Sequence, residues 1–269
     1  MEITQRPLVA LLTDFGTRDP WVAAMKIVLT SRCDAEVVDL GHEIAPHDVF
    51  EAALFLDFAI EPYRDGRKTI VVAVVDPGVG SDRRIIAAAK GSLVLLAPDN
   101  GLLDPAIDDS WELRAVEASH LFERGPSSTF HGRDRFAPVA AALASGAPFG
   151  SLGPALERAA LVRLPYEPPR VGVREVHGTI IAIDRFGNAV TDVEVSLVGE
   201  LRDWVARVGS AEIGVSARTY AEREGSREPF LIVGSRGTVE ISLARGSAAD
   251  LLHLDRLGPV HFHRVGADG

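Results

Sequence analysis

The chain has 269 residues, of which 46% are hydrophobic and 25% are charged, a composition typical of globular proteins. This length is sufficient for one large domain or two ordinary ones. The formal net charge is −10 and the pI is near 5.3. This acidic balance argues against nucleic acid or an anionic membrane as a partner, because both favour clustered Lys and Arg.

The chain contains one cysteine, Cys33, so it has no intramolecular disulfide framework. Sparse cysteine of this kind indicates a reducing compartment. The first residues show no apolar segment of a secretory signal, and no apolar run reaches the roughly 18 residues of a membrane span. We therefore expect a soluble protein of the cytoplasm.

The first 160 or so residues alternate strand-like and helix-like patterns. Asp19 and Pro20 are expected to serve as N-cap and first residue of one helix, and Asp48 as N-cap of a second. The predicted strands cover residues 8–13, 36–40, 69–75 and 93–97, and a helix rich in small residues is predicted over 136–144. This alternation predicts a layered α/β domain with a largely parallel sheet.

A proline-rich segment, residues 165–171, divides the chain into predicted domains 1–164 and 172–269. Beyond it the apolar residues recur with a period of two, which is typical of strands. A hairpin is predicted from residues 178–184 and 188–193, and further strands from 212–215, 230–233, 237–243 and 259–263. The second domain is therefore predicted to be all-β, a small antiparallel barrel or sandwich.

Three polar residues suggest proton-transfer chemistry. Asp76 follows an apolar strand and precedes a Gly-rich turn that leads to Arg83, and His131 lies about fifty residues further on. A carboxylate orients a His and makes it more basic, and a guanidinium favours hydroxide over water. Together they can activate a water molecule. The alternative is a structural salt bridge with a capping His, and the sequence weighs the two about equally.

Other polar residues also follow strands. Asp14 is well placed for a ribose diol, because a carboxylate accepts two hydroxyl hydrogen bonds. The Asn188 amide can hydrogen-bond the edge of an adenine, and Arg236 beside Ser235 can bind a carboxylate. A role in turns explains Asn188, Ser235 and Arg236 equally well. The pair His261-x-His263 has no third metal ligand of obvious spacing, so an ordinary strand is favoured over a metal site.

Taken in series, these motifs resemble the S-adenosyl-L-methionine hydroxide adenosyltransferases, relatives of the fluorinase and chlorinase that attack the same substrate with halide. The resemblance extends from about residue 8 to residue 250. The matching motifs are Thr13-Asp14-Phe15-Gly16 with Asp19 and Met25-Lys26, Asp76-Pro77-Gly78-Val79-Gly80 with Arg83-Arg84, Pro98-Asp99-Asn100-Gly101-Leu102, Phe130-His131-Gly132-Arg133-Asp134, Asp184-x-Phe186-Gly187-Asn188 and Ser235-Arg236-Gly237. Trp21 departs from the tyrosine usual in the family, and Arg236 from the smaller residue of many hydrolase members.

The resemblance implies an N-terminal α/β domain, a C-terminal β-barrel domain and a homotrimer with substrate held between subunits. It also implies a role for each matching residue. Asp14 would hold the ribose hydroxyls, Asp19 the methionine ammonium, and Ser235 with Arg236 the methionine carboxylate. Asn188 would bind the adenine edge, Tyr220 would pack on the base, and backbone near Ser247 would complete the pocket.

The triad of Asp76, Arg83 and His131 resembles the members that use water, whereas the halide-using relatives differ at the first and last of these positions. The resemblance therefore implies hydrolysis of S-adenosyl-L-methionine to adenosine and L-methionine by attack at C5′ of the ribose, without a metal or cofactor. Two alternatives stay open: a halogenase-like adenosyltransferase, and a non-catalytic sensor of S-adenosyl-L-methionine or adenosine.

Overall fold

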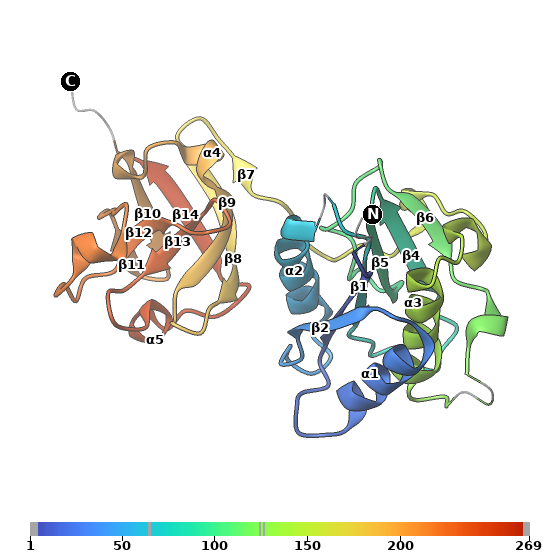
Figure 1. Cartoon of the computed structure of the whole chain (residues 1–269). Coiled ribbons are helices and arrows are strands. Elements are labelled where there is room, and N and C mark those ends of the chain that lie inside the picture. The colour runs from blue at the N-terminus through green and yellow to red at the C-terminus, as the bar shows by residue number, and fades with distance from the viewer. Residues whose placement is uncertain (1–4, 64–65, 124, 126, 266–269) are drawn as a thin grey trace. The chain divides into compact units, whose positions relative to one another are not determined.

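The structure is a computed structural model that describes residues 5–63, 66–123, 125 and 127–265. The chain divides into two compact units, which join between Pro165 and Tyr166 (Figure 1). Each unit has its own sheet and its own hydrophobic core.

The N-terminal unit contains a six-stranded mixed sheet with strand order β2-β1-β3-β5-β4-β6. Strands β1, β2, β3 and β5 are parallel, and β4 is antiparallel to both β5 and β6. The sheet is thus mostly parallel, as the alternating sequence pattern predicts. Its strands are β1 (Leu8–Thr13), β2 (Glu36–Gly41), β3 (Thr69–Val74), β4 (Ile85–Lys90), β5 (Leu93–Pro98) and β6 (Glu112–Ala115).

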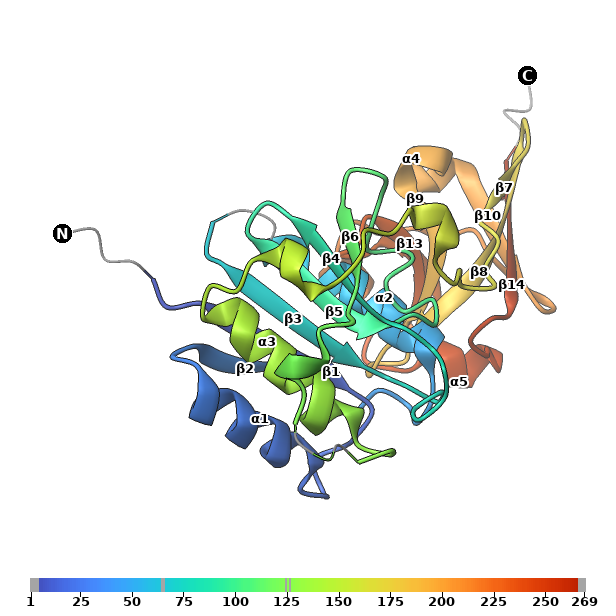
Figure 2. The same cartoon turned by 90° about the vertical axis from the view of Figure 1, so that its right-hand side faces the viewer.

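Strands β1, β3 and β5 are apolar on both faces because helices cover both sides of the sheet. Helices α1 (Trp21–Arg32) and α3 (Ala137–Ala144) pack with one set of alternate strand residues. Helix α2 (Val49–Ala59) packs with the other set. Figure 2 shows α1 and α3 in front of this sheet and α2 behind it.

The starts of the first two helices differ. Asp48 caps α2 as predicted, since its Oδ1 accepts a 2.8 Å hydrogen bond from the backbone N–H of Glu51. The prediction that Asp19 caps α1 is wrong: Pro20 occupies the N-cap position instead of the first helical position, and no side chain caps this helix. The carboxyl group of Asp19 therefore satisfies none of the first backbone donors of α1.

The C-terminal unit is an antiparallel sheet that curls into a barrel-like form, with strand order β11-β10-β14-β8-β9-β13-β12 and β7 paired to β8. Long strand β8 pairs with β14 along its first part and with β9 along its last part, so it joins both halves of the sheet. The strands are β7 (Arg170–Val171), β8 (Glu175–Ile183), β9 (Ala189–Glu194), β10 (Trp204–Val208), β11 (Ala211–Ile213), β12 (Phe230–Val233), β13 (Thr238–Ser242) and β14 (Pro259–Arg264).

The inward residues of these strands, among them Val176, Trp204 and Phe262, form the core of the barrel-like unit. Two short helices, α4 (Val195–Val198) and α5 (Ala248–Leu252), complete it. In the part of the chain that the structure describes, no helix has both the length and the apolar character needed to cross a membrane.

Candidate active site

Asp76, Arg83 and His131 form one hydrogen-bonded cluster. Nε of Arg83 donates to both carboxylate oxygens of Asp76, at 2.9 and 3.0 Å, and its Nη2 donates to Asp76 Oδ2 as well. The same Nη2 contacts Nδ1 of His131 at 2.9 Å. The Arg83 and Asp76 side chains are only 9% and 5% exposed, and His131 is 2% exposed. Ionic hydrogen bonds are strong in such a buried setting.

Strand ends and tight turns place these three side chains. Asp76 lies just beyond the end of β3, and Arg83 lies two residues before β4. The intervening turn is held by the hydroxyl of Ser81, which donates to the carbonyl of Gly78 at 2.7 Å. His131 directly precedes a π-helical turn, Gly132–Phe136, that leads into α3. The cluster thus gathers residues that are far apart in the sequence, on the edge where β3 ends.

The electrostatics of the cluster keep His131 neutral. Burial lowers the pKa of His131 below its usual value of 6.5, and the nearby charges of Arg135 and Arg83 lower it further, against the opposing charge of Asp76. Because a guanidinium only donates, Nδ1 of His131 must accept, and the hydrogen of the neutral ring is on Nε2.

Two buried donors in the cluster have no partner. Nη1 of Arg83 and Nε2 of His131 are inaccessible to solvent and make no hydrogen bond within the described residues. Buried donors are nearly always paired in folded proteins, and an unpaired one costs about 1–3 kcal/mol. Each of these donors therefore needs an acceptor that the described residues do not supply, and an oxygen ligand such as water or hydroxide is one such acceptor.

A pocket of about 290 Å³ adjoins the cluster and is lined by Asp14, Asp76 and His131. Three aromatic residues, Phe15, Trp21 and Phe130, form its apolar wall, and the last two rings meet edge to face with centroids 5.3 Å apart. One oxygen of the Asp14 carboxylate accepts a 2.8 Å hydrogen bond from the backbone N–H of His47. Asp19 is exposed and is not part of this lining.

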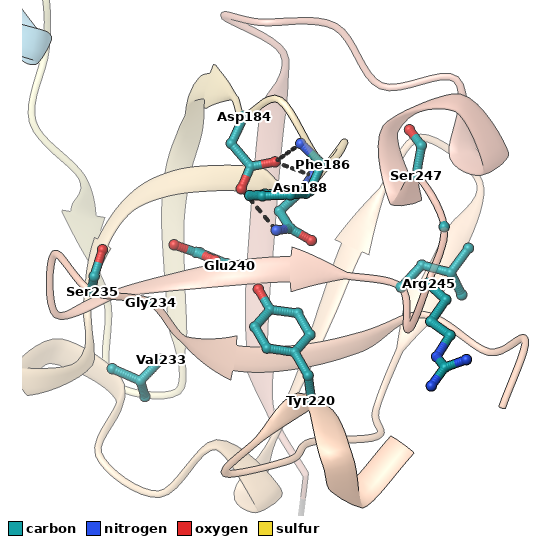
Figure 3. Close-up of a pocket in the computed structure, with 12 residues that line it drawn as sticks. Asp184, Phe186, Asn188, Tyr220, Val233, Gly234, Ser235, Glu240, Arg245 and Ser247 are labelled. Carbon is teal, nitrogen blue, oxygen red and sulfur yellow. Dashed lines mark hydrogen bonds between the residues drawn. The ribbon is translucent and has the colours of Figure 1, made fainter. Parts of the chain in front are cut away.

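A second pocket, of about 760 Å³, lies in the C-terminal unit (Figure 3). It is lined by four of the residues that the sequence singled out: Asn188, Tyr220, Ser235 and Ser247. Arg236 is not part of the lining, but its positive charge acts to lower the pKa of Glu240 in the pocket. The Tyr220 ring is half-exposed and packs edge to face on Phe230.

The turn between β8 and β9 builds one side of this pocket. Asp184 Oδ1 accepts the backbone N–H groups of Phe186 and Asn188, both at 2.8 Å, and its Oδ2 accepts Nδ2 of Asn188 at 2.8 Å. Figure 3 shows the nitrogen of the Asn188 amide turned toward Asp184 and its oxygen turned away. Gly187 is required in this turn, because it has a φ of 82° and a Cβ there would lie 2.1 Å from Oγ of Ser247.

Glu240 is a pocket residue that sequence reasoning missed. It lies in the middle of fully buried β13, with its carboxylate packed over Gly234, where a Cβ would approach within 1.8 Å of Oε1. Burial raises its pKa, and so does the negative charge of Asp184. The signal in the sequence is an acid within the otherwise uncharged strand pattern Thr-Val-Glu-Ile-Ser, where a charge is costly unless it serves a purpose.

His261 and His263 lie on the same face of β14, as their spacing predicts. The His177 ring from neighbouring β8 meets His261 edge to face, with centroids 4.6 Å apart. Even so, no group of three His, Cys, Asp or Glu residues among those described is arranged to hold a metal ion.

The chain thus combines two units. The first is an α/β unit with a buried cluster of Asp76, Arg83 and His131, and the second is a barrel-like unit with a pocket lined in part by polar residues. These features define a class of two-domain proteins. The model of the SAM hydroxide adenosyltransferase N-terminal domain matches residues 9–153, and that of the C-terminal domain matches residues 178–261. The chain therefore belongs to the SAM hydroxide adenosyltransferase family, which confirms the resemblance found in the sequence.

Individual relatives agree with this assignment. A protein of Thermus thermophilus named (R)-S-adenosyl-L-methionine hydrolase is 38% identical, over 94% of this chain and 98% of its own length. A fluorinase of Actinopolyspora mzabensis is more distant, at 29% identity over 91% of this chain and 92% of its own. The crystal structure of an uncharacterized conserved protein from Thermotoga maritima superposes with a TM-score of 0.84, at 30% identity over 95% of this chain and all of its own.

Proposed function

We propose that this protein is an enzyme that hydrolyses S-adenosyl-L-methionine to adenosine and L-methionine. The family assignment and the similarity to (R)-S-adenosyl-L-methionine hydrolases support this activity. The structural observation that carries the proposal is the buried cluster, in which the Asp76 carboxylate, a proton acceptor, is bound to Arg83, which in turn contacts His131. Arg83 Nη1 and His131 Nε2 have no partner among the described residues. A halide needs no proton acceptor, whereas water must lose a proton as it attacks.

In the proposed reaction a water oxygen attacks C5′ of the ribose in line with the bond to sulfur. The carbon–sulfur bond breaks, and its electron pair returns to sulfur, which leaves as the neutral thioether of methionine. The sulfonium is a good leaving group and needs no acid. Catalysis then consists of orientation, for which up to about 7–11 kcal/mol is available, and of removal of the proton of the water.

The hydrogen-bond directions assign different roles within the cluster. His131 Nε2 carries a hydrogen and donates, so it stabilises the incoming oxygen rather than accepting its proton. Arg83 stabilises the same oxygen with its fixed positive charge. Asp76 is then the proton acceptor, because it is the acceptor-only group of the three.

The remaining residues bind the substrate. Asp14, with one carboxylate oxygen held by the backbone of His47, offers the other to the ribose hydroxyls. In the pocket of the C-terminal unit, Asn188 binds the adenine edge, while Tyr220 and the backbone near Ser247 enclose the base.

The methionine end carries both charges of an amino acid. Ser235 and Arg236 bind its carboxylate, and Asp19 binds its ammonium. The enzyme acts in the cytoplasm as a homotrimer in which neighbouring subunits complete each site. It uses no metal or other cofactor, and neither nucleic acid nor a membrane is a partner.

Incubation of the purified protein with S-adenosyl-L-methionine in halide-free, oxygen-18 water tests the proposal. The expected products are L-methionine and adenosine that carries the label at its 5′ oxygen. Unlabelled adenosine, or turnover only when chloride is added, would contradict hydrolysis at C5′. Tight binding of adenosine without any turnover would instead support a sensor.

A further inference from the structure

A chain of hydrogen bonds runs through the N-terminal unit next to Asp14, and the proposed chemistry does not use it. Nζ of Lys26 on α1 donates to Asp39 Oδ2 at 2.7 Å, and the other oxygen of Asp39 contacts Nε2 of His42 at 2.9 Å. Nδ1 of His42 in turn lies 2.8 Å from Oγ1 of Thr13, the last residue of β1. Thr13 is fully buried and His42 is 5% exposed.

The donors and acceptors of this chain fit one arrangement of hydrogens. Burial acts to raise the pKa of Asp39, but the hydrogen bonds from Lys26 and His42 outweigh it, so the pKa is lowered and Asp39 is an ionised acceptor. His42 then donates from Nε2 and accepts at Nδ1, which leaves the hydroxyl of Thr13 as the donor. The inner half of the network, His42 and Thr13, is buried with its polar side-chain atoms satisfied, which favours a single conformation there.

The inner end of the network fixes the loop that carries Asp14. The side-chain oxygen of Thr13 accepts a hydrogen bond from the backbone N–H of Phe15 at 3.2 Å. This bond spans Asp14, which lies between the two residues in sequence. The backbone carbonyl of His42 accepts the N–H of Gly16 at 2.7 Å. The segment that begins at His42 also supplies the backbone N–H of His47 that holds Asp14 Oδ2.

We propose that Thr13 and His42 are positioning residues that aim the Asp14 carboxylate at the ribose hydroxyls. This inference rests on the proposed function, in which Asp14 binds the ribose. The Asp14 side chain is 9% exposed, so it has little room to find another productive orientation if its loop shifts. Displacements as small as 1 Å at a binding group are known to be costly in enzymes.

The decisive variant is Thr13→Val, which removes the hydroxyl and keeps the β-branched shape in a buried strand. We expect the full-length variant to bind adenosine about tenfold more weakly, equivalent to about 1.4 kcal/mol, and to bind 2′,3′-dideoxyadenosine as the wild type does. Thr13→Ser keeps the hydroxyl and should restore adenosine affinity.

Thr69→Val is the matched control. Thr69 is a buried threonine at the start of neighbouring β3, and its hydroxyl donates to the carbonyl of Arg67 at 3.0 Å, away from Asp14. Its replacement should leave the affinities for both nucleosides unchanged. A general loss of stability would show in both threonine variants, whereas the selective loss of adenosine affinity would show only in Thr13→Val.

Asp14→Ala and the double variant Thr13→Val/Asp14→Ala separate this inference from the proposed function. If Thr13 acts through Asp14, Thr13→Val should have no further effect on adenosine affinity once Asp14 is removed. Additive losses, or equal losses for adenosine and dideoxyadenosine, would overturn the positioning role. Unchanged adenosine affinity in Asp14→Ala alone would instead refute the ribose contact of the proposed function.

Discussion

The guanidinium of Arg83 donates to Nδ1 of His131 across 2.9 Å, so the buried imidazole presents a hydrogen, not a lone pair, at its other nitrogen. A His beside a carboxylate can serve as a general base. Here the direction of one hydrogen bond makes His131 a donor, so in the proposed reaction the proton of the attacking water goes to Asp76. This distinction governs how variants of the cluster should behave.

Replacing His131 with alanine should reduce turnover far more than binding. Loss of one preorganised donor to a developing charge typically lowers kcat by about 10²–10³. The affinity for 5′-deoxyadenosine, which lacks the oxygen that the attacking water contributes, should stay close to that of the wild type. Steady-state kinetics with S-adenosyl-L-methionine and calorimetric titration with 5′-deoxyadenosine measure the two effects.

His120→Ala is the control for this experiment, since His120 is an exposed histidine of the same unit. This variant should change neither kcat nor the affinity for the nucleoside. If the affinity for 5′-deoxyadenosine fell in parallel with kcat in His131→Ala, the imidazole would be a structural or binding group and the donor role would be wrong.

The acid limb of the pH–rate profile should report the ionisation of His131. A protonated ring must carry a hydrogen on Nδ1, where Arg83 already donates, so activity should fall as the pH drops through the pKa of His131. That pKa lies below 6.5 because of burial and the charges of Arg135 and Arg83. Arg135→Gln removes one of these charges and should move the acid limb of kcat/KM to higher pH.

Arg114→Gln provides the matched comparison, since Arg114 lies in the same unit and pairs with Glu112 instead of acting on His131. Its profile should coincide with that of the wild type. If the acid limb of the kcat/KM profile does not move in Arg135→Gln, or moves to lower pH, the ionisation of a group other than His131 determines its position.

The sequence indicates which residues gather in the cluster better than it indicates the contacts that hold them. Asp14 and Asp76 stand out because they follow apolar strands β1 and β3, and the ends of such parallel strands converge at one edge of a sheet. Strand β4 was not predicted, because its Ile-Ile-Ala-Ala-Ala-Lys sequence lacks the β-branched alternation of a typical strand and its position depends on pairing with β5 and β6.

The supporting contacts are non-local, which explains why the sequence alone did not reveal them. His42 contacts Thr13 across 29 residues, and neither has a neighbour in sequence that marks it as part of a network. The prediction that Asp19 caps α1 is wrong for a local reason, because the helix begins one residue later than expected and Pro20 is its N-cap. Both the contact between His42 and Thr13 and the first residue of α1 depend on the path of the backbone, which the type of a single residue does not determine.

Glu240→Gln should make the protein more resistant to unfolding at neutral pH. Burial, and then the charge of Asp184, raise the pKa of Glu240 above the value of 4.5 that applies in an unfolded chain. Between the two pKa values the folded state binds more protons than the unfolded state, so this group lowers stability as the pH rises through that window. Glutamine has the same shape and does not ionise.

Thermal unfolding midpoints of wild type and Glu240→Gln, measured in parallel from about pH 4 to pH 8, test this sign. The two midpoints should agree at the acid end and separate in favour of the variant as the pH rises. A difference that is constant with pH, or one that favours the wild type at neutral pH, would mean that the Glu240 charge is compensated in the folded protein.

The orientation of Asn188 predicts selectivity for adenine over hypoxanthine. Asp184 accepts a hydrogen from Nδ2, so the amide is fixed with Oδ1 as the acceptor for an exocyclic amino group. Adenosine has that amino group, whereas inosine has a carbonyl oxygen in its place, which would face Oδ1 as a second acceptor. An unmade buried hydrogen bond costs about 1–3 kcal/mol, so the wild type should prefer adenosine by roughly tenfold or more.

Asn188→Ala should bind adenosine more weakly and lose this preference, as measured by calorimetric titration with both nucleosides. The turn itself should persist, because Asp184 still accepts the backbone N–H groups of residues 186 and 188. The ribose is identical in the two ligands, so any change in their ratio reports on the base alone. A variant that still prefers adenosine as strongly as the wild type would place base recognition elsewhere in the pocket.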